Sequence, residues 1–314
     1  MEINGYLFRD DEELKYLILR NKDVNYNNIA NTLKFIEVQK IDRFVLGDVD
    51  LDISKYLSVL YMLKKIKYLF ICNFESLKID WTYHGFTYLK HLVCNKAAFK
   101  IDFKCLPEIE FVDITYSEKN RSLFDCKNLK TLVLHGFKGK NLNDFNKLIL
   151  LENLELISSS IENLDGVENL ENLKKIELHR CSKLNNLSSL NLLKFLEIFI
   201  VANLNSLKSL NFIRSLNQLI GLSIRDCKNI EYADDILSQH HLIFLGVHNA
   251  GEFTTLKPII YLKKIKRITL GSTTIIDGDV SPILELKTLE YIQFANSKKI
   301  NYSLEFIKQK MNLD

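Results

Sequence analysis

One apolar pattern returns at a short and nearly constant interval in the middle of this chain. The pattern Leu-x-x-Leu/Ile-x-Leu/Ile starts at Leu151, Leu173 and Leu193, so that successive copies are 22 and 20 residues apart. A repeat of this length supplies one supersecondary unit, which cannot bury its apolar side alone and must stack on its neighbours. The period therefore predicts a solenoid in which each repeat contributes one short strand.

The same pattern can be followed over most of the 314 residues. We term the first apolar place of each copy its anchor. The twelve anchors are Ile41, Ile66, Leu89, Ile109, Leu129, Leu151, Leu173, Leu193, Leu219, Leu242, Ile265 and Leu289. Their intervals run from 20 to 26 residues, and the shortest leave room for only 3-10 or irregular turns before the next strand. We therefore expect about twelve strands, with a helical turn or two in the longer repeats.

These repeats resemble the leucine-rich repeat family, and their short length is most similar to the bacterial internalin type. The resemblance implies an α/β solenoid, a curved right-handed superhelix with a parallel concave β-sheet of about twelve strands and short helical or 3-10 convex segments. The ninth place of the family's repeat is usually Asn, but here it holds Ser, Thr, Cys and apolar residues. The repeats are therefore degenerate, and the expected Asn ladder is at best partial.

Residues 1–40 depart from the repeat. Apolar residues at i, i+4 and i+7 within residues 29–36 form one stripe, which predicts a helix. The preceding stretch fits two readings. Asp10 or Asp11 would cap a helix with an acidic first turn, whereas LKYLIL from Leu14 fits a strand.

The C-terminal end and the absence of a linker-like segment determine the predicted domain organisation. Ser303 would cap a short helix over the sequence that follows it. The chain has only three prolines and eleven glycines, and no segment reads as a linker. We expect one continuous domain, with an N-terminal cap over residues 1–40, repeats over 41–298 and a C-terminal cap over 299–314, because a solenoid must cover its two open ends.

Composition and hydropathy argue against several function classes. The 42 basic and 39 acidic residues nearly balance, which gives no indication of a nucleic-acid partner. A membrane helix needs roughly 20 apolar residues in a row, and charged residues interrupt even the most apolar stretch, from Leu192 to Leu204. The first residues, MEINGYLFRDDEELK, lack the basic and then apolar order of a secretory signal. These features predict a cytoplasmic protein with no membrane span.

Motifs with a catalytic or metal-binding spacing are missing from the sequence. We find no GxSxG, GxxxxGK[ST], GxGxxG or HExxH, and the six cysteines form no CxxC pair. His91, His135, His179 and His248 fall on the predicted concave face, but in repeats that are too far apart for these histidines to share one ion. We therefore expect no enzyme activity, cofactor, metal ion or intrachain disulfide.

The residues between the inward-pointing places face the opposite side of each strand and form the concave wall. At the fifth place of three consecutive repeats the predicted register stacks Glu155, Glu177 and Glu197 about 4.8 Å apart. Like charges at that spacing repel by about 0.8 kcal/mol per neighbouring pair in water. Two explanations stay open: lysines on the same strands neutralise the carboxylates, or a basic surface of a partner does.

Aromatic, arginine and histidine side chains surround these glutamates in the predicted register. Such residues dominate the binding energy of protein interfaces. The candidate partner-binding residues are Glu155, Glu177, His179, Arg180, Phe195, Glu197, Phe199, Arg225, Asp226, Phe244 and His248.

The sequence thus predicts a non-enzymatic module that holds a protein partner on its concave face. We favour an inhibitor, such as an immunity protein that neutralises a toxin, because the resemblance extends to the ribonuclease inhibitor, a solenoid that acts by occlusion alone. The alternatives are a scaffold or regulatory subunit of an enzyme, and an exported adhesin or virulence factor. The expected partner is a toxin or enzyme with a basic contact surface, and the unbound chain is expected to be a monomer.

Overall fold

The computed structural model describes the backbone of residues 2–3, 6–11, 14–19, 29–46, 65–71, 86–94 and 101–313. The chain divides into two compact units. Unit 1 consists of Met1–Phe137 and Lys147–Leu151, and unit 2 consists of Lys138–Asn146 and Glu152–Asp314. Twelve strands, β4 to β15, follow the twelve predicted anchors, five of them in unit 1 and seven in unit 2. The predicted fold class is therefore confirmed.

Unit 1 begins with an antiparallel arrangement and continues with parallel strands. Strands β1, β2 and β3 pair antiparallel in order, and β3 then pairs parallel with β4. The elements are β1 (Glu2–Ile3), β2 (Tyr6–Asp11), β3 (Leu14–Leu19), α1 (Ile29–Gln39), β4 (Arg43–Leu46), β5 (Tyr68–Ile71), β6 (His91–Cys94), η2 (Phe103–Cys105), β7 (Phe111–Thr115), η3 (Glu118–Asp125) and β8 (Thr131–His135). The predicted helix of residues 29–36 is confirmed. The helical reading after Asp10 or Asp11 is wrong, because the apolar alternation of LKYLIL pairs as β3 with β2.

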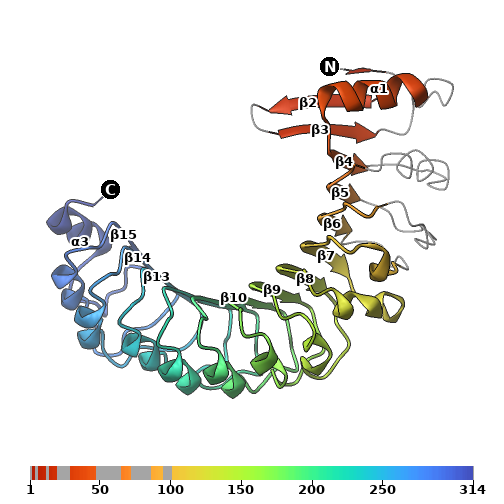
Figure 1. The fold of residues 1–314 in the computed structure, drawn as a ribbon. Helices are drawn as coiled ribbons and strands as arrows, with labels where there is room; N and C mark the ends of the chain where they lie inside the picture. Colours follow the sequence, from red (N-terminus) through yellow and green to blue (C-terminus); the bar gives the residue numbers. More distant parts are fainter. Residues whose placement is uncertain are drawn as a thin grey trace. The chain divides into compact units, whose positions relative to one another are not determined.

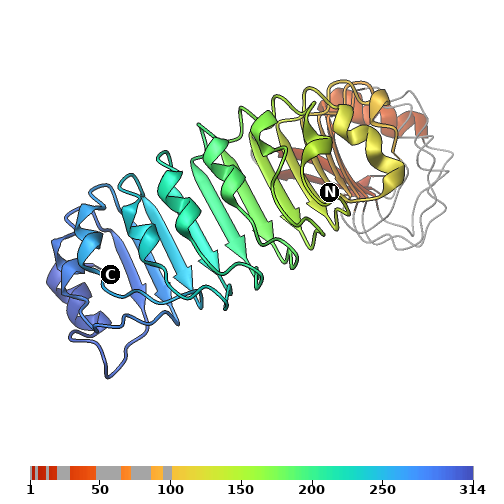
Figure 2. The ribbon, with the colours of Figure 1, turned by 90° about the horizontal axis from the view of Figure 1, so that it is seen from below.

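Unit 2 is a regular stack in which each strand pairs parallel with the next (Figure 1). Its strands are β9 (Asn153–Ile157), β10 (Lys175–His179), β11 (Ile198–Ala202), β12 (Gly221–Arg225), β13 (Phe244–His248), β14 (Arg267–Gly271) and β15 (Tyr291–Phe294). Its helices are η4 (Asn143–Phe145), η5 (Val167–Asn169), η6 (Ser188–Leu192), η7 (Asn211–Ser215), η8 (Asp234–Ser238), η9 (Lys257–Tyr261), η10 (Ser281–Glu285) and α3 (Leu304–Met311). The sheet lines the inner side of this stack and the 3-10 helices its outer side, as Figures 1 and 2 show.

Each repeat of unit 2 buries its first, fourth and sixth places between the sheet and the return segment. In the repeat of β10 these places are Leu173, Ile176 and Leu178, all fully buried. The ninth place, usually Asn in the family, is Cys181, whose Sγ lies 3.6 Å from the Leu156 carbonyl of the preceding strand. Thr273 makes the corresponding hydrogen bond to Val247, at 3.1 Å. The expected partial ladder is therefore present at these two places, through a Cys and a Thr.

The repeat of β11 has a different register from the one predicted. Phe199 pairs beside Ile176, and Val201 beside Leu178. Leu196, Phe199 and Val201 are buried, so the anchor is Leu196 and the predicted anchor at Leu193 is wrong by three residues. The physical reason is that LLKFLEIFIV contains two overlapping frames of the pattern, and the later one places a phenylalanine ring in the core.

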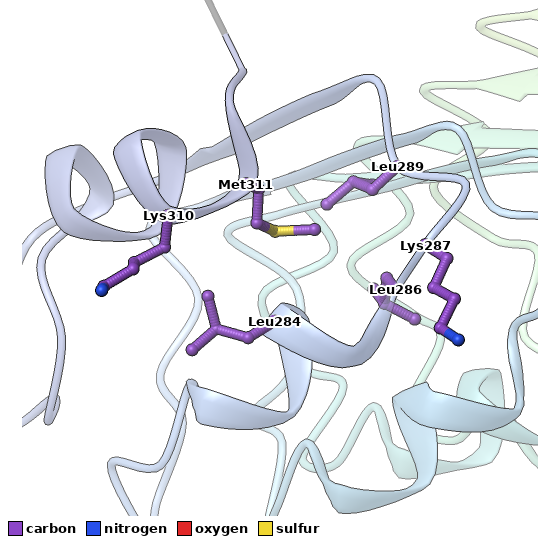
Figure 3. A pocket seen from close by; sticks show the side chains of 6 residues that line it. All are labelled: Leu284, Leu286, Lys287, Leu289, Lys310 and Met311. Carbon is purple, nitrogen blue, oxygen red and sulfur yellow. The ribbon is translucent and has the colours of Figure 1, made fainter.

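The C-terminal end of unit 2 carries the predicted helix. The Ser303 hydroxyl accepts a hydrogen bond from the Phe306 amide at 3.2 Å, which confirms the predicted N-cap of α3. The helix lies against the last repeat and leaves an open pocket of about 370 Å³ beside it. Met311 lies between Leu284 and Leu289 in this pocket, while Lys310 points away (Figure 3). The pocket is thus the rim of the core where the stack ends.

Two further observations concern the described residues only. None of their helices has the length and apolarity that crossing a membrane requires. The thiols of Cys126, Cys181 and Cys227 are free. Cys72 lies outside the described residues.

Candidate functional site

The inner faces of six neighbouring strands in unit 2 form the surface that we term the wall. It consists of the third, fifth and seventh places of strands β9 to β14, which alternate with the core places along each strand. The wall residues are Asn153, Glu155, Ile157, Lys175, Glu177, His179, Ile198, Ile200, Ala202, Gly221, Ser223, Arg225, Phe244, Gly246, His248, Arg267, Thr269 and Gly271.

A cluster of charged groups occupies the β9 and β10 end of the wall. Glu155 and Glu177 are direct partners on the paired strands, and His179 follows Glu177 on the same face. His179 Nε2 lies 3.1 Å from Glu177 Oε2 and 3.6 Å from Glu155 Oε1. Lys175 Nζ lies 2.6 Å from the other oxygen, Oε1, of Glu177. These four side chains form one continuous network on two strands.

The network perturbs the ionisation of Glu177. The hydrogen bond from His179 and, to a smaller extent, the one from Lys175 lower the pKa of Glu177 to about 2, against partial burial, which raises it. Hydrogen bonds that a carboxylate accepts stabilise its charged form. Glu177 is therefore ionised over the physiological pH range and remains so in mildly acidic solution.

The three-glutamate stripe predicted from the sequence is reduced to two. The wall neighbour of Glu177 on β11 is Ile200, whereas Glu197 is an exposed residue just before the strand. The remaining carboxylate pair meets His179 and Lys175. For Glu177 the first of the two explanations therefore holds: a lysine on the same strand neutralises its carboxylate.

The two phenylalanines predicted beside this stripe are also placed differently. Phe199 is 0% exposed and belongs to the core, where its ring packs edge-on against Phe212 at a centroid distance of 5.7 Å. Phe195 is 58% exposed, but it precedes β11 and lies outside the wall. Both expectations are wrong for the same reason, which is the shift of the anchor by three residues.

The other predicted candidates fall into two groups. Phe244, Arg225 and His248 are wall residues of β12 and β13, as expected. Arg180 and Asp226 lie one residue beyond their strands, where the backbone has positive φ angles of 55° and 53°. Their side chains run along the edge of the wall.

At that edge the side chains of adjacent repeats bind one another. Arg180 Nε donates to the Ser158 hydroxyl at 3.3 Å. Asn249 donates to the Asp226 carboxylate at 2.9 Å. Each of these contacts joins one turn to its neighbour, the first between the repeats of β9 and β10 and the second between those of β12 and β13.

The centre of the wall is apolar; the sequence reading predicted Phe244 on the wall but missed the isoleucines of β11. Ile198, Ile200 and Phe244 are half-buried there, and Ala202 is nearly buried. The ring of Phe244 covers Gly246, where an added Cβ would lie 3.1 Å from the ring. The sequence contains the pattern that predicts this. When Leu196 is taken as the anchor, IFIVA alternates between wall and core, and its two isoleucines face the wall.

Cationic and hydrogen-bonding groups bound the apolar centre on its β12 to β14 side. Arg225 is exposed at the end of β12, and the Arg267 guanidinium lies over the Tyr291 ring at 4.3 Å from its centroid. His248 Nε2 lies 3.0 Å from the Thr269 hydroxyl. Burial and, to a smaller extent, the charge of Arg225 lower the pKa of His248, so its neutral form is favoured.

The corresponding places of unit 1 have an aromatic character. The His91 ring lies between the rings of Tyr68 and Phe111, at centroid distances of 4.4 and 5.4 Å. The Arg43 guanidinium covers Tyr68 at 3.6 Å from the ring centroid. Burial lowers the pKa of His91. In unit 1 the histidine is therefore part of a stack of rings.

One set of described side chains has the composition and spacing of a metal-ligand group. The ligand atoms of Glu155, Glu177 and His179 all lie within 4.8 Å of one another. The sequence reading considered only ions shared between histidines and therefore overlooked a single histidine with two carboxylates from paired strands.

Comparison with known proteins gives information on the fold. No protein-family profile matches the sequence, and no curated protein matches it.

Solved structures do match. An internalin (inlF) from Listeria monocytogenes has a TM-score of 0.62 at 14% identity, over 93% of this chain and 88% of the internalin chain. A chain of the Drosophila Toll–Spatzle complex gives 0.58 at 12% identity, over 95% of this chain and 45% of its own length. A chain of the TLR13–ssRNA13 complex gives 0.50 at 16% identity, over 88% and 52%. At these identities the likeness shows the fold alone, which is that of a leucine-rich repeat solenoid.

Proposed function

We propose that the chain binds a protein partner on the wall of unit 2. The observation that carries the proposal is the order of side-chain types across the wall, which changes from carboxylates through an apolar centre to arginines. Protein interfaces commonly have an apolar core bounded by polar groups at the rim. Half-exposed Ile198, Ile200 and Phe244 form the centre, and Glu155 and Arg267 belong to the two flanks.

The charges at the two ends of the wall define the partner's contact surface. Glu155 favours a cationic group opposite β9, which retains part of the expected basic surface. Arg225 and Arg267 favour an acidic or hydrogen-bond-accepting group opposite β12 to β14. Such complementarity increases the association rate and excludes wrongly oriented partners.

Within this class we favour an inhibitor that covers its partner, such as a protein that neutralises a toxin. Six strands at a spacing of about 4.8 Å make a wall roughly 24 Å wide, which is comparable in scale to a protein-sized contact. A similar fold takes part in the Toll–Spatzle complex, which supports the use of such a chain for binding another protein. A scaffold role and an adhesin role are the alternatives, and the following experiment distinguishes both from an inhibitor.

The test uses one isoleucine of the wall and one away from it. Ile200→Lys places a cation in the apolar centre beside Glu177, its cross-strand partner. Ile276→Lys makes the same chemical change at a residue that is 51% exposed and outside the strands. Proteins retained from a cell extract by the parent chain are compared with those retained by each variant, and the affinity of the purified partner is then measured.

We expect the partner to bind the parent chain and Ile276→Lys equally, and Ile200→Lys at least about tenfold more weakly, because a buried charge at an interface centre loses its hydration. Equal binding by all three forms would contradict the wall as the binding site. Stoichiometric loss of the partner's own activity on binding identifies an inhibitor, whereas unchanged activity identifies a scaffold or adhesin role.

A further inference from the structure

The cluster at the β9 and β10 end of the wall brings three metal-ligand side chains together from two paired strands. Glu155 and Glu177 are direct cross-strand partners, and His179 lies two residues after Glu177 on the same face. The side chains of Glu155, Glu177 and His179 are 28%, 19% and 23% exposed. They stand on the ladder of a parallel sheet, which holds their Cα atoms in a fixed register.

The distances within the cluster are close to those that a bound ion requires. His179 Nε2 lies 3.6 Å from Glu155 Oε1 and 3.1 Å from Glu177 Oε2. In a tetrahedral zinc site with ligand bonds of about 2.0 to 2.1 Å, neighbouring ligand atoms lie roughly 3.3 Å apart. All three donor atoms lie within 4.8 Å of one another, so small side-chain rotations would complete the geometry.

A neighbouring lysine leaves the required oxygen of Glu177 in place. Lys175 Nζ binds Oε1 of Glu177 at 2.6 Å, while Oε2 is directed at His179. The lysine and an ion would therefore use different oxygens of one carboxylate. A hydrogen bond of this kind to a ligating carboxylate fixes its orientation.

We propose that Glu155, Glu177 and His179 form a binding site for one divalent transition-metal ion of the zinc class. An imidazole nitrogen favours such an ion over calcium or magnesium, which prefer six or more oxygen ligands. Three protein ligands leave a fourth position for water on the open side of the wall. The site does not depend on the proposed partner, because the ion alone is its ligand.

Two other histidines of the chain provide matched controls. His135 and His248 occupy the same seventh place of their repeats. His135 Nε2 lies 2.9 Å from the Asp113 carboxylate, and His248 Nε2 lies 3.0 Å from the Thr269 hydroxyl. The pattern predicts binding only at His179, because the described residues contain one metal-ligand group of three or more side chains and it includes His179.

The experiment is a cobalt titration of the full chain after treatment with a chelator and removal of the chelator. Cobalt(II) substitutes for zinc and has visible absorption bands that report its coordination. We expect one cobalt ion per chain, displaced by an equivalent of zinc. His179→Gln and Glu155→Gln should each weaken binding by at least about tenfold, the scale of a lost contact in a metal site. His135→Gln and His248→Gln should bind as the parent does.

The circular dichroism of each variant establishes that it is folded, and two independent ligand variants keep the test valid should one of them fail to fold. Cobalt absorption that is unchanged in both ligand variants, or no saturable binding by the parent chain, would overturn the proposal. Bands typical of thiolate ligands would also overturn it, because they would place the ion on cysteines. None of these outcomes affects the partner-binding test, since Ile200 is not one of the proposed ligands.

Discussion

Strands β10 and β11 pair over their whole length but give the wall opposite chemistry. The wall residues of β10 are Lys175, Glu177 and His179, whereas those directly beside them on β11 are all apolar: Ile198, Ile200 and Ala202. Both strands bury the same kind of side chain on their other face. The core therefore requires only the apolar places, and the wall places are available for function.

The boundary between these two strands is abrupt. Strand β10, which carries Glu177, lies one strand spacing, about 4.8 Å, from β11, which carries the isoleucines. A charged group beside an apolar patch is the arrangement of a rim beside an interface core. Two predictions concern the side chains whose burial determines where this boundary lies, and a third concerns the charges on its β10 side.

The largest expected effect concerns the two phenylalanines near β11. Phe199→Ala removes a ring that is 0% exposed and packs on Phe212, so it should lower the free energy of unfolding by about 3 to 5 kcal/mol. Phe195→Ala, at a side chain that is 58% exposed, should change it by less than about 0.5 kcal/mol. Urea unfolding of both variants measures the difference. Small and similar losses for the two variants would return the anchor to Leu193, because that frame places both rings on the wall.

The same repeat explains where sequence reasoning reached its limit. The frames Leu193-x-x-Leu196-x-Ile198 and Leu196-x-x-Phe199-x-Val201 both satisfy the apolar pattern. Spacing along the chain separates them only weakly, because an anchor at Leu193 gives intervals of 20 and 26 residues, one at Leu196 gives 23 and 23, and the other intervals run from 20 to 25 residues. The choice depends on pairing with β10 and on the burial of a whole aromatic ring, which are properties of the stack.

Elsewhere a single frame fits, and the sequence was sufficient. In the repeats of β9 and β10 the predicted pairs Leu154 with Leu156 and Ile176 with Leu178 are buried. The orientation of Glu155, Glu177 and His179 follows directly from this register. Their convergence on one point does not, because it depends on rotamers and on the competing contact of Lys175.

A second prediction compares the first and third places of the β11 repeat, which are both aliphatic. Leu196 is 1% exposed, and Leu196→Ala should cost about 2 to 5 kcal/mol of unfolding free energy. Ile198 is half-buried on the wall, so Ile198→Ala should cost about 1 kcal/mol, because much of its apolar surface is already in contact with water. Chemical denaturation of the two variants gives the ranking. Equal losses would mean that both side chains lie in the core, as the earlier frame predicts.

The smallest expected effect concerns the charges on the β10 side, where Glu177→Gln is compared with Glu197→Gln. Hydrogen bonds from His179 and Lys175 lower the pKa of Glu177 from 4.5 to about 2, and a carboxylate whose pKa is lower in the folded chain stabilises the fold above its unfolded pKa. Because water screens this partly exposed group, Glu177→Gln should cost about 1 kcal/mol at pH 7. That difference from the parent should disappear as the pH falls from about 4.5 towards 2, since protonation then removes the same charge from the parent.

Glu197→Gln, at an exposed residue before β11, should match the parent at pH 7 within about 0.5 kcal/mol. Urea midpoints measured across this pH range decide the matter, and a loss for Glu177→Gln that stays constant down to pH 2 would show that packing, not charge, is what the glutamate contributes.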